Sequence, residues 1–195
     1  MGLLDKLTKV IGMEKKENDT TNANEKRNDS IEEIVLLPSS HVVEETEFGE
    51  DESEYCITFK VNDAFKETKS HAAEVTMLNT YALNDEYGNE GKIPYIAIIM
   101  DDEIYCGMEE FKENGIFSDA IEITPLDGKF YFKAKKEYYG DMMYFYGFDR
   151  CEGFWENSAL CIVYPISYVG TQNEKTLINV LDEAARSYHE EKIES

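Results

Sequence analysis

The sequence has little positive charge and no long apolar run. It contains 19 Lys and Arg residues against 41 Asp and Glu residues, a formal net charge of -22 at pH 7. Because nucleic-acid binding depends on Lys and Arg neutralising phosphates, this balance argues against DNA or RNA as a direct partner. The longest uncharged apolar run, residues 93–100, is far below the roughly 20 residues that a membrane-spanning helix needs. No transmembrane segment is expected.

Signals for secretion are also missing. The N-terminal stretch has no long apolar region and no small-residue cleavage site, since Asp5, Lys6 and Lys9 interrupt it. We therefore predict a cytoplasmic location. The four cysteines are spread along a chain that is long enough to bury a core without disulfides, so reduced thiols are expected.

Histidine is scarce, which limits nucleophilic catalysis. The chain has three histidines, His41, His71 and His189. A serine or cysteine nucleophile needs a base within hydrogen-bonding distance, and only His71, paired for example with Cys106, is a reasonable candidate. No GxSxG motif accompanies it. The sequence favours a protein that is not an enzyme, while a catalytic group of Cys, His and carboxylate side chains stays open.

Patterns that would hold a metal ion or a cofactor are absent too. Nine residues separate Cys151 and Cys161, the closest pair of cysteines, whereas zinc sites use much shorter spacings. Residues 71–74 (HAAE) lack the second histidine of an HExxH motif, and residues 87–92 (YGNEGK) lack the spacing of a phosphate-binding loop. We predict neither a metal site nor a cofactor.

Composition divides the chain into three parts. Residues 1–13 carry apolar side chains at helical spacing and are predicted to form a short amphipathic segment. Residues 14–30 contain no aromatic residue and no aliphatic residue larger than alanine, so they are predicted to be a flexible polar linker. Residues 1–30 hold six basic and six acidic residues. The whole negative excess therefore belongs to residues 31–195, the predicted single acidic globular domain.

Short apolar runs predict a sheet in this domain. Residues 55–61 alternate between apolar and mostly polar side chains, which is the period of a half-buried strand. Residues 93–100 are apolar on both faces, and residues 101–103 are predicted to turn the chain into a second arm at residues 104–108. The remaining predicted strands are residues 120–124 and 129–135, joined in a hairpin by Asp127-Gly128, and residues 142–148 and 159–164.

Two stretches do not read as strands. Residues 44–54 hold seven acidic groups and are predicted to be a solvated loop. Residues 62–83 fit neither the strand period nor the helix period, and their structure stays open.

The C-terminal region predicts a helix. Residues 171–174 (TQNE) match a capping box, and Leu177, Leu181, Ala184 and Tyr188 follow on one stripe. The predicted fold class is α+β: a curved antiparallel sheet or partial β-barrel of about six to eight strands, with this amphipathic helix packed on it.

Residues 129–136 are the one basic stretch of the domain, with lysines interleaved with aromatic residues. Such a strand can offer rings and cations to single-stranded nucleic acid, but lysines also protect an edge strand from pairing with other chains. The acidic balance of the whole chain favours the edge-strand interpretation.

Residues 140–155 hold the densest group of aromatic residues. Within residues 142–148 both faces are apolar, which predicts a central strand covered on two sides. Tyrosine is an unusual choice for full burial because its hydroxyl needs a partner. The candidate ligand-binding or partner-binding residues are therefore Tyr144, Tyr146 and Trp155.

Three functions are compatible with this sequence. The favoured one is a non-catalytic cytoplasmic interaction module, a binder or inhibitor of a protein with a basic surface, because the domain is acidic and catalytic motifs are missing. The second is an enzyme or small-ligand-binding protein with an aromatic-lined pocket around residues 138–155. The third is a membrane-surface or scaffold protein tethered by residues 1–13.

Overall fold

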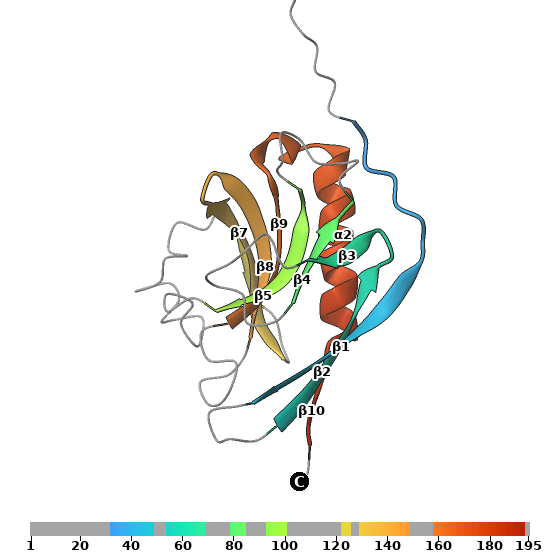
Figure 1. The fold of residues 1–195 in the computed structure, drawn as a ribbon. Helices are drawn as coiled ribbons and strands as arrows, with labels where there is room; N and C mark the ends of the chain where they lie inside the picture. Colours follow the sequence, from blue (N-terminus) through green and yellow to red (C-terminus); the bar gives the residue numbers. More distant parts are fainter. Residues whose placement is uncertain are drawn as a thin grey trace, which may run out of the picture. The chain divides into compact units, whose positions relative to one another are not determined.

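A computed structural model describes residues 32–48, 54–68, 79–84, 93–100, 122–125, 129–148 and 158–193 (Figure 1). All of them belong to the unit Ile31–Ser195. The predicted amphipathic segment 1–13 and the predicted linker 14–30 lie outside the described residues.

The described elements are mainly strands. In chain order they are β1 (Ser40–Phe48), β2 (Glu54–Asn62), β3 (Phe65–Thr68), β4 (Thr80–Leu83), β5 (Tyr95–Met100), β6 (Glu122–Pro125), β7 (Phe130–Tyr138), β8 (Asp141–Phe148), β9 (Ser158–Pro165), the 3-10 turn η4 (Ile166–Tyr168), α2 (Gln172–Ser187) and β10 (His189–Lys192). Within these residues, no helix is long and apolar enough to cross a membrane.

The strands form two antiparallel sheets. The larger has seven strands in the order β3-β4-β5-β9-β8-β7-β6, and the smaller has three in the order β1-β2-β10. The larger sheet is open, because β3 and β6 end the order without pairing with each other. An α+β fold with a curved antiparallel sheet and a C-terminal helix is thereby confirmed, while the separate three-stranded sheet was not anticipated (Figure 1).

Helix α2 buries the stripe that its sequence predicts. Leu177, Leu181 and Ala184 are fully buried in the larger hydrophobic core. This core also contains Ile57, Phe59 and Val61 of β2, the predicted inward face of that strand. The helix therefore holds the two sheets in one core, and its removal would expose the apolar side of each.

The helix start differs from the predicted capping box. The Thr171 hydroxyl donates to the Tyr168 carbonyl (2.6 Å) instead of accepting from the helix backbone. Glu174 accepts from the Gly170 N–H (2.7 Å) and the Tyr164 hydroxyl (2.8 Å), and it pairs with the Lys135 ammonium at 2.5 Å. The glutamate therefore fastens the helix to the sheet.

The segment before β1 is tied to the same helix end. Asn173 accepts from the Ile34 N–H at 2.8 Å, and its side-chain amide donates to the Glu32 carbonyl at 2.8 Å. Asn173 thus fixes the segment that precedes β1 to the start of α2.

Strand β8 is the central two-sided strand that the sequence predicts. Met142, Tyr144, Tyr146 and Phe148 lie in the core shared with α2, whereas Met143 and Phe145 lie in a second core on the opposite face. Gly147 also faces that second core, and a Cβ there would meet the Phe132 ring at 2.5 Å. Glycine at this position makes room for a phenylalanine of the neighbouring strand.

The edge-strand interpretation of residues 129–136 is wrong. Strand β7 lies between β8 and β6, so it is internal. The predicted hairpin of β6 and β7 is confirmed, but a bulge between Phe130 and Phe132 puts these two rings into different cores. The alternation of the sequence places both rings on one face, because it does not reveal the extra residue that a bulge inserts.

The solvated loop predicted at residues 44–54 is wrong over Glu44–Phe48, which belongs to β1, and at Glu54, where β2 begins, while residues 49–53 lie outside the described residues. Carboxylates are compatible with this strand because Glu44 is exposed and Glu45 accepts a hydrogen bond from the Tyr81 hydroxyl. Residues 65–68 and 80–83, within the stretch that the sequence left open, form β3 and β4. The second arm predicted at residues 104–108 lies outside the described residues, and β5 pairs with β4 and β9.

Candidate functional site

Negative charge is concentrated in the three-stranded sheet. Its strands hold six carboxylates against two lysines: Glu44, Glu45, Glu47, Glu54, Glu190 and Glu191, with Lys60 and Lys192. The strands of the seven-stranded sheet are balanced, with four of each sign: Glu67, Glu122, Glu137 and Asp141, with Lys66, Lys133, Lys135 and Lys136. Among the described strands, the three-stranded sheet therefore carries a net negative charge and the seven-stranded sheet carries none.

The strand register sorts the side chains of this sheet between two faces. Val43 pairs with Phe59, and both are buried against the core. The alternate residues form the outer face: Val42, Glu44 and Thr46 of β1, Cys56, Thr58 and Lys60 of β2, and His189 and Glu191 of β10. Val42 is 59% exposed on this face. The outer face thus combines an exposed apolar residue with carboxylates.

Carboxylates on this face act on the Cys56 thiol. Its pKa is raised by desolvation and by the negative charges of Glu44 and Glu191. Cys56 pairs with Glu191 across the strands, and Glu44 lies on the other neighbouring strand. The thiol is therefore kept protonated, which makes it a poor nucleophile.

Strand β1 has one edge that pairs with no described strand. In an antiparallel pair, alternate residues direct both backbone groups toward the partner strand. The Asp63 N–H donates to the Ser39 carbonyl (3.0 Å), so the backbone groups of Ser39 point toward β2. Every second residue after it, His41, Val43 and Glu45, therefore also directs its backbone N–H and C=O groups toward β2. Val42, Glu44 and Thr46 consequently direct their N–H and C=O groups away from β2.

A contact on the other side of β2 supports this phase. Lys60 is the register partner of Val42, and its N–H donates to the Ser187 hydroxyl at 2.8 Å and not to β1. Since the backbone N–H of Lys60 points away from β1, the backbone groups of its partner Val42 point away from β2.

Side-chain contacts fix β1 to the rest of the domain. The Ser40 hydroxyl donates to Glu183 of α2 at 3.3 Å, and the Tyr81 hydroxyl donates to Glu45 at 2.5 Å. Desolvation and the Glu45 carboxylate raise the pKa of Tyr81, so its hydroxyl keeps the proton that it donates. Contacts with α2 and β4 therefore hold β1 in place.

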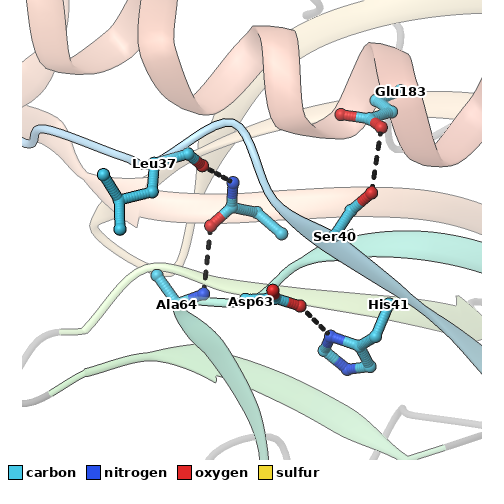
Figure 2. Close-up of polar contacts among 7 residues, drawn as sticks. Leu37, Ser40, His41, Asp63, Ala64 and Glu183 are labelled. Atoms are coloured by element: carbon cyan, nitrogen blue, oxygen red, sulfur yellow. Dashed lines mark hydrogen bonds and ion pairs between the residues drawn. The ribbon is translucent and has the colours of Figure 1, made fainter.

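His41 and Asp63 form the one His–carboxylate pair among the described residues (Figure 2). His41 Nδ1 lies 3.0 Å from Asp63 Oδ1, with side chains 41% and 47% exposed. Hydrogen bonds from His41 and Ser39 hold the pKa of Asp63 below its usual value. Ser40 points to the opposite side, toward Glu183, so this Ser and His do not form a catalytic pair (Figure 2).

The predicted site tyrosines lie inside the core. Tyr144 and Tyr146 are both buried, and the Tyr146 hydroxyl donates to Asp182 of α2 at 2.6 Å. Burial and the Asp182 carboxylate raise the pKa of Tyr146 well above its ordinary value. Trp155, His71, Cys106 and Cys151 lie outside the described residues. The binding role assigned to Tyr144, Tyr146 and Trp155 stays a prediction.

Reactive and metal-binding groups do not gather in the part of the chain that the structure describes. No group of three or more His, Cys, Asp or Glu side chains there is arranged to hold a metal ion. Cys161 is fully buried, and desolvation raises its pKa to about 12. This cysteine packs as a small apolar residue.

Sequence reasoning missed the edge of β1. Its acidic residues suggested a loop, and His41, Val43 and Glu45 on its inner face include a single aliphatic side chain. Only the pairing with β2 shows that this segment is a strand. Comparison with protein-family models, curated proteins and solved structures finds no match to the chain.

Proposed function

We propose that the protein is a non-catalytic interaction module that binds, and acts as an inhibitor or adaptor of, a protein with a basic surface. The observation that carries the proposal is the separation of charge between the two sheets, with six carboxylates against two lysines in the smaller and an even balance in the larger. Solubility alone requires net charge but no such separation. A one-sided field speeds the encounter with an oppositely charged partner and selects its orientation.

The chemistry of the described residues supports this choice over catalysis. The two described cysteines, Cys56 and Cys161, both have raised pKa values, and the Ser40 hydroxyl bonds Glu183 and not the neighbouring His41 imidazole. We place the protein in the cytoplasm, where free thiols such as these persist.

Binding to a lysine-containing probe peptide tests the proposal. The peptide alternates lysine with valine, has blocked ends, and is titrated by calorimetry at increasing salt. We expect binding that weakens with salt, because the attraction is between exposed charges. Neutralising two outer-face carboxylates (Glu44→Gln and Glu191→Gln together) is expected to weaken binding by about tenfold.

The matched control removes the same charge from the other sheet. Glu67 and Glu137 are exposed and belong to the seven-stranded sheet, so Glu67→Gln with Glu137→Gln leaves the net charge equal to that of the first variant. This control is expected to bind nearly as the parent protein does. Equal weakening by both variants would mean that only net charge matters, and it would overturn the proposal.

A further inference from the structure

The free edge of β1 is unlike the other sheet edges of the described residues. The four edge strands are β1, β10, β3 and β6, and β1 has nine residues while each of the others has four. Short strands, charges and proline are the usual means of keeping edges from pairing, and β6 ends in Pro125. A long edge is therefore the exception in this fold.

We infer that β1 receives an extended lysine- or arginine-containing segment of a partner protein as an added strand. This inference rests on the proposed function, and it names the place and the mode of binding. The backbone groups of Val42, Glu44 and Thr46 point away from β2, as the ladder phase requires. They offer alternating donors and acceptors along one line, which is the pattern that strand addition uses.

The side chains of the same three residues select the occupant. Val42, Glu44 and Thr46 are exposed on the outer face, so they lie beside the outward side chains of any added strand. A cationic residue next to Glu44 forms a favourable cross-strand pair, and an apolar residue covers Val42. An alternating pattern of basic and apolar residues fits this edge.

A second copy of the chain does not fit. Pairing β1 with β1 would bring Glu44, Glu45 and Glu47 of both copies onto the same small sheet, and each copy carries a net charge of -22. Like charges on neighbouring strands destabilise a sheet. The acidity that protects the edge against self-association therefore leaves it open to a cationic strand.

The edge is fixed before a partner arrives. The Ser40–Glu183 bond and the Tyr81–Glu45 bond hold β1 to α2 and to β4. An edge that is already extended loses little conformational entropy on binding, which favours a short peptide segment.

Two probe peptides separate strand addition from charge attraction alone. The first is the lysine–valine peptide described above. The second has the same sequence with its two central amides N-methylated, which keeps every charge and blocks both backbone edges. We expect the methylated peptide to bind at least about tenfold more weakly, since it loses central hydrogen bonds and cannot lie flat against β1.

A protein variant probes the same contact. Val42→Pro removes an N–H that the β1–β2 ladder does not use, and proline is tolerated on edge strands in this position. We expect it to weaken binding of the unmodified peptide by about tenfold with an unchanged circular dichroism spectrum. In the parent protein, peptide binding should slow hydrogen exchange at the amides of Val42, Glu44 and Thr46. If Val42→Pro does not fold, hydrogen exchange in the parent protein tests strand addition by itself.

Each outcome discriminates. Equal binding of the two peptides, with unchanged exchange at Val42, Glu44 and Thr46, would overturn strand addition, and the charge-based proposal would stand if Glu44→Gln with Glu191→Gln still weakened binding. Failure of the unmodified peptide to bind at low salt would contradict both. Dimer formation by the protein alone would overturn the choice of a cationic partner over a second copy.

Discussion

Replacing Glu174 with glutamine tests how α2 is fastened to the sheet. The carboxylate receives three donors: the Lys135 ammonium (2.5 Å), the Gly170 N–H (2.7 Å) and the Tyr164 hydroxyl (2.8 Å). Glutamine has the same shape but no charge, and its amide NH2 group would face one of these donors without accepting a hydrogen bond from it. It also leaves the Lys135 ammonium, whose side chain is only 13% exposed, without its counterion.

The expected loss is about 3 kcal/mol in the free energy of unfolding. A hydrogen bond to a charged group contributes roughly 1.5–3 kcal/mol, and removing one partner of a buried ion pair costs about 3–5 kcal/mol. The lower end applies, because glutamine keeps one acceptor oxygen. Urea denaturation followed by circular dichroism measures the change.

A double-mutant cycle with Lys135→Met isolates the ion pair. Once the lysine is gone, Glu174→Gln no longer strands a buried cation, so the two losses together are expected to fall about 2 kcal/mol short of their sum. The control is Glu137→Gln, an exposed carboxylate of β7, with an expected loss of less than about 0.5 kcal/mol. A loss below about 0.5 kcal/mol for Glu174→Gln, or strict additivity in the cycle, would refute this reasoning.

The pH dependence of the same variant has a defined sign. Although burial favours the neutral acid, hydrogen bonds from Lys135, Gly170 and Tyr164 hold the pKa of Glu174 below its usual value. A depressed pKa gives stability that is present above the unfolded-state pKa and is lost as the pH falls through the folded-state pKa. The stability difference between the parent protein and Glu174→Gln should therefore shrink in acid, and a difference that grows in acid would contradict the account.

Three further predictions concern the two cores. Leu181→Ala is expected to lower the free energy of unfolding by about 3 kcal/mol in urea denaturation, because Leu181 of α2 is fully buried in the larger core. Lys175→Ala, an exposed position of the same helix, should be nearly neutral. Gly147→Ala should cost about 1–3 kcal/mol, because its Cβ would meet the Phe132 ring, and an unchanged denaturation midpoint would contradict that packing. Cys161 should resist iodoacetamide in the native protein at about pH 8 and react after denaturation, with rapid native modification in peptide mapping as the contrary result.

The sequence was informative where its period was strong. The alternation in β2, the two-sided apolar run in β8 and the stripe of α2 each require one kind of burial, and the structure has it. These patterns record which side chains leave water, and burial is the dominant favourable term in folding.

The remaining features depend on contacts between distant segments. The role of Glu174 needs Lys135, which lies far away in the chain and reaches it only through the packing of α2 on the sheet. The strand at Glu44–Phe48 exists because β2 pairs with it, and its own residues read as a loop. The candidate edge of β1 is defined by which backbone groups β2 leaves unused, and composition carries no such information.

The most direct test of the interaction proposal reverses one charge in each sheet. Glu44→Lys acts on the outer face of β1, and Glu137→Lys acts on an exposed position of β7 with the same change in net charge. Binding of the lysine–valine peptide is measured for both by calorimetry at low salt and at about 0.15 M salt. The proposal predicts that Glu44→Lys weakens binding by about tenfold at low salt while Glu137→Lys stays within about twofold of the parent protein. Equal weakening by the two variants, or no binding to the parent protein, would contradict it.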